Sequence, residues 1–481
     1  MQITKSTGGR IMFQHLSKIL QHFRYNFKRE TTWHWFIAII MGFIIRTNNG
    51  GITRMISSLK MKPGLYHNML HFFRSEGYTV SDLYDKWIKI VERETELLQK
   101  AGRVILLGDH IKIPKEGRRM PDIQIMHQDS ENSGKSEYIE GHIYAHVSGL
   151  LSNGSVTRSL PLITEQQKAP PKKEGSSEPD GDTLVTQMVN LVSKTVDSLK
   201  VNNKAIVALD AYFSKASAFL AADKAVDKSG NRRLEIVTRG RDDSVGYGAP
   251  EPRPKGKRGA APKYRKIVLW DLFSDMSRFS EADLCLYGKP TKVKYLCMDL
   301  LWKPLNRVIR FVVVESYRGR MVLLCSDLTL SPENIIEIFS LRFKIETSFD
   351  EQKNDMGCFS YRFWTAALPK RKHWSKNDTP SITVHSELIN ETKRAINSFV
   401  CMGTIAAGIL SIIAFSHSRQ IWQRYPGWVR TLRSHVPTIA ITKETIAQDF
   451  FVFLRLYSHL PLASFINSKM RSDEFLYDDV G

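Results

Sequence analysis

Residues 184–220 read LVTQMVNLVSKTVDSLKVNNKAIVALDAYFSKASAFL, and they give the clearest sign of the fold class. Residues 184–199 space their apolar side chains as an amphipathic helix does. Residues 205–213 open with the apolar run AIVAL, which is typical of a buried strand and ends on Asp210. Residues 215–226 favour a second helix. A buried strand between two helices predicts an α/β core.

Buried strands are also predicted on both sides of this stretch. Three further segments have strand patterns, namely RVILLGDHIKI (103–113), YIEGHIYAHVSGLL (138–151) and LEIVTRG (234–240). Residues 164–182 are rich in Pro, Gly, Ser and charge, so we expect a solvated loop there. Residues 241–330 differ, because strand patterns replace the alternation of strands and helices. They predict a β-rich insertion.

Helical patterns occupy both ends of the chain. The insertion is followed by SPENIIEIF, in which Ser331 fits an N-cap and Pro332 the first helical position. The predicted organisation is a helical N-terminal region (1–100), a first part of the core (101–240), the β-rich insertion (241–330), a second part of the core (331–372) and a helical C-terminal region (373–481).

The 481 residues carry a formal net charge of +20. A charge so large and positive indicates a polyanionic partner, with nucleic acid as the first candidate and a generally basic protein as the alternative. Residues 252–266 contain no acid, so we expect this loop to lie against DNA through cations such as Lys255, Lys257 and Arg258, unless it is a solvated linker. The N-terminal helices form either a DNA-binding head or a plain helical cap.

The sequence favours a cytoplasmic protein without membrane contact. Its five cysteines form no CxxC pair and are odd in number, which indicates reduced thiols. The basic first residues lack the apolar core and cleavage site of a secretory signal. Of two apolar runs, residues 35–45 are too few for a membrane span, and residues 398–415 include Ser, Thr and Gly. We expect the second run to be a buried core helix.

Two predicted strands end on an aspartate, Asp109 and Asp210. A carboxylate at the end of an apolar strand costs desolvation energy unless a cation meets it. Either aspartate alone could simply cap the next turn. Together with Glu346 on a predicted helix they form a set of three carboxylates, which are the oxygen ligands that Mg²⁺ or Mn²⁺ prefers.

Glu346 lies in EIFSLRFKIETSFDEQKNDMG (337–357), which we interpret as a helix. Its apolar side consists of Ile338, Leu341, Ile345 and Phe349. At about 100° per residue, Phe339, Arg342, Glu346 and Lys353 fall within roughly 60° of one another, so Arg342 and Lys353 can flank Glu346. The alternative is a solvated ladder in which Arg342 pairs with Glu346 and Lys353 pairs with Asp350.

The pattern Phe339-x2-Arg342-x3-Glu346-x6-Lys353 resembles the Tyr-x2-Arg-x3-Glu-x6-Lys signature of DDE transposases of bacterial insertion sequences. The order of Asp109, Asp210, β-rich insertion and Glu346 is similar to that family as well. The resemblance covers about residues 30–420. One departure is Phe339 in place of Tyr, which removes a hydroxyl that would touch a phosphate.

The resemblance implies an α/β, ribonuclease-H-like catalytic core interrupted by the insertion. It implies that Asp109, Asp210 and Glu346 are catalytic and bind two Mg²⁺ ions, with Mn²⁺ as a substitute. Phe339, Arg342 and Lys353 are then expected to contact DNA. The expected partners are the terminal inverted repeats of the element and its target DNA, bound by a homodimer associated with the bacterial nucleoid in the cytoplasm.

The function implied is cleavage of phosphodiester bonds at the element ends and transfer of the 3′-hydroxyl into target DNA. Two alternatives stay open. One is a ribonuclease-H-like nuclease that does not mobilise DNA, and the other is a DNA-binding repressor with an inactive core. A first structural expectation is that the carboxylates of Asp109, Asp210 and Glu346 converge although they lie far apart in the sequence.

Overall fold

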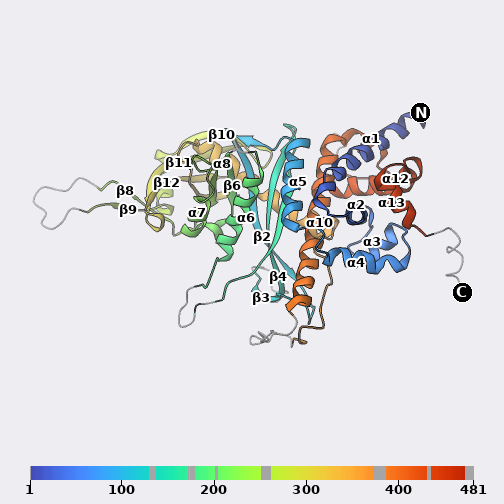
Figure 1. Cartoon of the computed structure of the whole chain (residues 1–481). Helices are drawn as coiled ribbons and strands as arrows, with labels where there is room; N and C mark the ends of the chain where they lie inside the picture. Colours follow the sequence, from blue (N-terminus) through green and yellow to red (C-terminus); the bar gives the residue numbers. More distant parts are fainter. Residues whose placement is uncertain are drawn as a thin grey trace, which may run out of the picture.

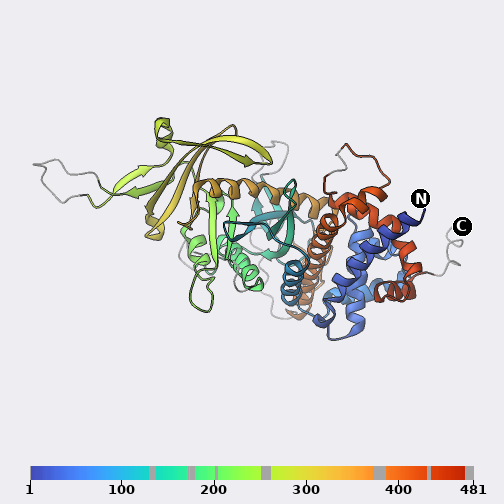
Figure 2. The same ribbon diagram turned by 90° about the horizontal axis from the view of Figure 1, so that it is seen from above.

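The computed structural model describes residues 2–128, 137–171, 173, 179–200, 204–250, 262–371, 386–430 and 435–471. A single mixed β-sheet runs through the middle of the molecule, with helices on both of its faces and a helical part at one end (Figures 1 and 2). The predicted α/β class is therefore confirmed, and the sheet is larger than the core strands alone suggested.

The centre of the sheet is parallel. Strand β2 (Arg103–Pro114) pairs with β6 (Lys204–Leu209), and β6 pairs with β7 (Leu234–Arg239), both in parallel. On the other side of β2, β4 (Tyr138–Ser152) runs antiparallel. It is flanked by β3 (Gln124–His127) and β5 (Thr157–Gln167), and the short β1 (Gln99–Lys100) pairs with β2.

The β-rich insertion continues this sheet. Strand β13 (Gly319–Cys325) pairs antiparallel with β7, and the strand order then runs through β12 and β11 to β8 and β9. The remaining bounds are β8 (Val245–Gly248), β9 (Arg265–Val268), β10 (Ser280–Leu286), β11 (Lys289–Trp302) and β12 (Arg307–Ser316). The insertion is therefore rich in strands, as predicted, and backbone hydrogen bonds within one sheet attach it to the core.

Helices cover both faces of the parallel strands (Figure 2). On one face α6 (Leu184–Ser198) and α7 (Ala216–Ala222) share a hydrophobic cluster with Val104, Leu106 and Val207. On the other face α8 (Pro332–Ser340) and α9 (Lys344–Asp350) pack in a second cluster, with Ile105, Leu107, Ile206 and Ala208. This alternation is what the period of two in a strand produces. Ser331 caps α8 by accepting a hydrogen bond from the Asn334 N–H at 3.3 Å, as predicted.

The two predicted helical regions form one packed unit (Figure 1). Helix α10 runs through it and contacts α2, α4, α5 and α12 as well as strand β5. The helices are α1 (Gln2–Gln21), α2 (Glu30–Ile45), α3 (Ile52–Ser58), α4 (Tyr66–Arg74), α5 (Val80–Glu94), α10 (Ser386–Ser416), α11 (Ser418–Arg424), α12 (Ile439–Leu456) and α13 (Pro461–Lys469).

Helix α10 is the one helix among the described residues that is long and apolar enough to cross a membrane, but 94% of its most apolar window is buried inside the protein. The prediction of a buried core helix over residues 398–415 is confirmed.

The loop predicted for residues 164–182 begins too early, because residues 164–167 belong to β5.

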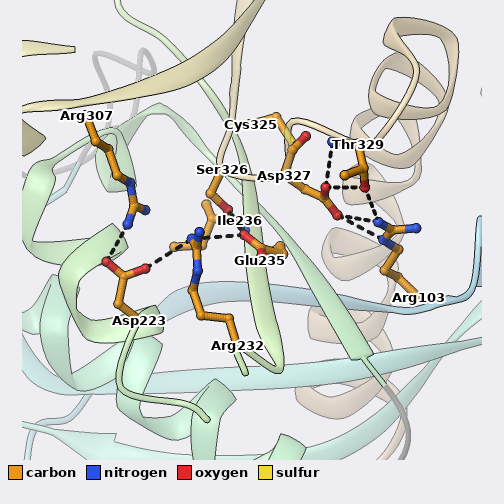
Figure 3. A network of polar contacts seen from close by, with 10 residues as sticks. All are labelled: Arg103, Asp223, Arg232, Glu235, Ile236, Arg307, Cys325, Ser326, Asp327 and Thr329. Carbon is orange, nitrogen blue, oxygen red and sulfur yellow. Dashed lines mark hydrogen bonds and ion pairs between the residues drawn. The ribbon is translucent and has the colours of Figure 1, made fainter. Parts of the chain in front are cut away.

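A polar network fixes the point where the chain returns from the insertion to the core (Figure 3). Asp327, which follows β13, accepts hydrogen bonds from Arg103 Nε and Nη2 at 2.9 and 2.7 Å. Burial alone would raise the pKa of Asp327, but hydrogen bonds from Thr329 and Arg103 hold it below its ordinary value. Further along, Arg307 of β12 pairs with Asp223 at 2.6 Å. The insertion is thus tied to the core by side chains as well as by the sheet.

We expect Asp327→Asn to lower the free energy of unfolding by about 2 kcal/mol, because it leaves the largely buried Arg103 guanidinium without its anion. Glu315→Gln is the control, since it breaks the Arg320–Glu315 pair, which is far more exposed and worth about 0.5 kcal/mol or less. Urea unfolding of both variants measures the difference. Equal losses in the two variants would contradict a structural role for the Asp327 network.

Candidate active site

Asp109 and Asp210 lie at the same edge of neighbouring strands. The parallel register of β2 and β6 pairs Leu107 with Ala208, and each aspartate comes two residues later. Adjacent strands lie about 4.8 Å apart, so the backbone brings the two carboxylates together across 100 residues of sequence. Asp210 also caps the 3₁₀-helix Ala211–Phe213, because its Oδ1 accepts a hydrogen bond from the Tyr212 N–H at 3.0 Å. Asp210 therefore caps a turn, as the alternative interpretation predicts, and it also lies near Asp109.

Arg342 connects this strand edge to the helix that carries Glu346. Its Nη1 lies 3.2 Å from Asp109 Oδ2, and its Nη2 lies 3.3 Å from Glu346 Oε1. Asp109 Oδ1 accepts the His110 N–H at 2.8 Å. The Glu346 side chain is 65% exposed, whereas that of Asp109 is 19% exposed. One guanidinium therefore holds a largely buried strand carboxylate and an accessible helix carboxylate around the same point.

The electrostatics of Asp109 favour a cation at this edge. Burial, followed by the nearby charge of Asp210, raises the pKa of Asp109 from 3.8 to about 7. The positive charge of Arg342 and the hydrogen bond from the His110 N–H act in the opposite direction without cancelling the rise. An anionic Asp109 is therefore unfavourable with the side chains present, and additional positive charge would relieve it.

The raised pKa of Asp109 predicts a dependence of stability on pH. Because the folded pKa lies above the unfolded one, stability falls as the pH rises from about 4 to about 7 and then stays low. We expect Asp109→Asn to remove a contribution of about 4 kcal/mol to this fall, corresponding to roughly three pKa units. Urea unfolding between pH 4 and pH 8, with a chelator present, measures it. Parallel pH profiles for the two proteins would contradict the raised pKa.

A buried polar network holds α9 against the sheet behind Asp109. His146 of β4 is paired with Asp109 across the β2–β4 ladder. Its ring nitrogens lie 2.9 Å from Thr164 Oγ1 and 3.1 Å from Ser348 Oγ. Burial lowers the pKa of His146 to about 3, so the ring is neutral. His146 thus positions the helix that carries Glu346, and its place among apolar residues of the predicted strand 138–151 is the sequence signal that could have revealed it.

The far end of the same helical stretch is clamped by the turn after α2. Asn49 donates from Nδ2 to the carbonyls of Lys353 and Asn354 at 3.3 and 2.7 Å. Arg46, which is fully buried, donates from Nη2 to the carbonyl of Gly357 at 3.0 Å and to that of Met356. Burial lowers its pKa to about 10. The N-terminal region therefore contributes directly to the position of the candidate active-site helix.

The stretch from 337 to 357 is helical but not one straight α-helix. It consists of the end of α8, the 3₁₀-turn Leu341–Phe343, α9 and the π-turn Glu351–Asp355. The salt-bridge ladder forms only in part. Arg342 pairs with Glu346, whereas Asp350 accepts a hydrogen bond from Asn354 and the exposed Lys353 has no side-chain partner among the described residues.

Phe339 does not occupy the position predicted for a DNA contact. Its side chain is 9% exposed and packs in the cluster beneath α8. Phe339 lies on the buried face of α8 with Ile335 and Ile336, which precede it by four and three residues, so its side chain points into the core. Lys255, Lys257 and Arg258 lie outside the described residues.

The candidate site has the oxygen donors of a hard divalent cation but not the arrangement of a formed site. In the part of the chain that the structure describes, no group of three or more His, Cys, Asp or Glu side chains is arranged to hold a metal ion. The Arg342 guanidinium lies between two of the three carboxylates. A scan against protein-family models and a search of curated proteins found no match to this chain.

Proposed function

We propose that this protein is a DDE transposase that cuts DNA at the ends of a mobile element and transfers the freed 3′-hydroxyl into target DNA. The observation that carries the proposal is that Asp109 and Asp210 lie on neighbouring strands and that Arg342 bridges Asp109 and Glu346. Asp109 follows the last residue of β2 that pairs with β6, Asp210 follows the end of β6, and Arg342 contacts both Asp109 and Glu346. A ribonuclease-H-like core is the fold that this proposal implies for the α/β sheet.

Asp109, Asp210 and Glu346 would hold two Mg²⁺ ions, or Mn²⁺ in their place. Their donor set is entirely oxygen, as these ions prefer, and the raised pKa of Asp109 shows that this carboxylate gains from added positive charge. Bound ions supply activation of a water or hydroxyl oxygen and stabilisation of the leaving oxygen. The Arg342 guanidinium would turn from the carboxylates toward a DNA phosphate, where its two N–H groups donate together.

The remaining roles follow from position and charge. Lys353 is exposed in the π-turn after α9, so its ammonium is available to a phosphate near the site. The net charge of +20 attracts DNA over longer distances. The proposed partners are the terminal inverted repeats and the target DNA, bound by a homodimer in the bacterial cytoplasm.

The test is an assay with two substrates built from the DNA that flanks the gene. An uncut duplex containing an inverted repeat reports cleavage, and a pre-cut duplex with a free 3′-hydroxyl reports joining to a plasmid. We expect both reactions, each dependent on Mg²⁺. Cleavage without joining would favour the nuclease alternative. DNA binding with neither reaction would favour the repressor and overturn the proposal.

A further inference from the structure

A groove of about 1220 Å³ lies along the segment that follows β2 and does not include the carboxylates of the candidate site. Three segments form its walls: the turn after α2 with the start of α3 (49–53), the connection that follows β2 (114–120), and the segment that follows the candidate active-site helix (360–364). Two of these segments continue directly from the elements that carry Asp109 and Glu346. The groove is therefore built on the same rigid elements as the site.

The groove has an excess of positive charge. Exposed cations reach it from two walls, namely Arg118, Arg119, Arg362 and Lys370, against one acidic side chain, Glu116, among its described lining residues. None of these four cations has an ion-pair partner within the described residues. Four unpaired cations around one concave surface are the arrangement that a polyanion would neutralise.

The walls are fixed before any ligand arrives. The N–H of Thr365 donates to the carbonyl of Arg119 at 3.1 Å, and that of Arg371 to the carbonyl of Arg118 at 3.0 Å. Lys115 faces inward, since its Nζ donates to the carbonyls of Phe359 and Tyr361, and burial lowers its pKa to about 8. Lys115 thus holds the wall together and is not one of the cations offered to a ligand.

The floor of the groove is locked in the same way. The buried Tyr361 hydroxyl lies 2.6 Å from His142 Nδ1, and it accepts a hydrogen bond from Tyr144 at 2.7 Å. The His142 Nε2–H donates to the carbonyl of Pro121 at 2.8 Å, so Nδ1 is free to accept from Tyr361. Because such bonds hold two walls and the floor, the backbone that carries the cations is fixed before binding, which reduces the entropy lost on binding.

Two large aromatic side chains stand exposed among these cations. Trp364 is 58% exposed and Tyr66 is 37% exposed, and both line the groove. An acidic protein would satisfy the cations but gives no particular reason for two exposed rings in the groove. Nucleic acid satisfies both features, because its phosphates pair with the cations while its sugars and bases offer flat surfaces to the rings.

The distance between the groove and Asp109 determines how far from the cleaved bond the groove would contact the DNA. On this wall the groove begins at Pro114, the last residue of β2 and the fifth after Asp109, and its cations follow, so the contact lies about 20 Å from Asp109. That length equals about six base pairs of duplex at about 3.4 Å each. Resting on the proposed function, we propose that the groove binds the phosphate backbone of the DNA being cut, about six base pairs from the cleaved bond.

The first test measures binding alone. The double variant Arg118→Gln/Arg362→Gln removes one cation from each of two walls, and Lys224→Gln/Lys228→Gln removes two exposed cations that follow α7 and do not line the groove. Binding to a duplex of about 30 base pairs is measured over a range of salt concentrations. We expect the groove variant to lower the slope of log K against log salt by about two and the control to leave it unchanged. Equal slopes in both variants overturn the proposal.

The second test places the contact relative to the cleaved bond. Element-end duplexes extend about three or about twelve base pairs from that bond. We expect the groove variant to bind the long duplex at least about 10-fold more weakly than the wild type and the short duplex equally well. Equal loss on both lengths overturns the position. If the wild type neither cuts nor joins DNA while the groove variant still lowers the salt slope, the proposed function fails and DNA binding by the groove stands.

Discussion

Asp210→Asn is expected to reduce DNA cleavage by about 10³-fold or more while end binding changes less than about threefold. The asparagine keeps an oxygen that can accept the Tyr212 N–H, so the 3₁₀-turn remains capped. What it removes is the negative charge next to Asp109. Because phosphate contacts supply most of the affinity for DNA, binding should survive a change that abolishes the chemistry.

The control for this experiment is Asp210→Ala, which removes both the charge and the cap. It should cleave as poorly as Asp210→Asn and should also lose about 1 kcal/mol of stability. Cleavage rates on the flanking-DNA substrate and melting temperatures are measured for both variants. If Asp210→Asn cleaves at the wild-type rate, Asp210 is only the cap of a turn and the catalytic assignment is wrong.

Arg342 is expected to give the second largest effect. Arg342→Ala should slow strand transfer about 10- to 100-fold, corresponding to the loss of one charge-assisted phosphate contact of about 1–3 kcal/mol. Arg342→Lys should also be slow, because an ammonium cannot reproduce two parallel N–H donors toward one phosphate. The same change should leave Asp109 and Glu346 with a cation nearby, so its effect on folding is expected to be small.

Strand-transfer rates and melting temperatures of the two Arg342 variants are compared with those of Lys353→Ala and Lys228→Ala. Lys353→Ala should slow transfer without altering the melting temperature, since its side chain is exposed. Lys228→Ala, far from the site, should change neither quantity. Unchanged transfer with a lowered melting temperature in the Arg342 variants would mean that Arg342 and Glu346 form only a salt bridge.

Local sequence patterns were sufficient to predict the elements that carry the candidate site. The apolar run of β6 ends just before Asp210, and that of β2 ends just before Asp109, although β2 itself continues to Pro114. The cap at Ser331 is readable from residue types alone. The convergence of the two aspartates also followed, because neighbouring parallel strands end at the same edge of a sheet. The sequence patterns did not predict the pairing of β13 with β7, which makes the insertion part of the same sheet.

Two features of the site needed the three-dimensional structure for a physical reason. Phe339 is buried because it lies on the face of α8 that packs against the sheet together with Ile335 and Ile336, and tertiary packing decides which face of a helix meets a sheet. Arg46 and Asn49 act on residues about 300 positions away, so nothing in their own neighbourhood reveals the contact. Buried arginines are rare, so the residue type of Arg46 alone predicts a position at the surface.

The packing of α2 has a consequence for how the chain is made. Residues 36–45 of α2 are buried, partly against α10, α12 and α13, which end at Lys469. Ribosomal synthesis at about 5–20 residues per second leaves roughly 20 to 80 seconds before those partners emerge. During that time part of the apolar surface of α2 lacks its final cover, because only the neighbouring α3 and α4 are made soon after it. We therefore expect the yield of folded protein in the cell to depend on chaperones that shield nascent apolar segments.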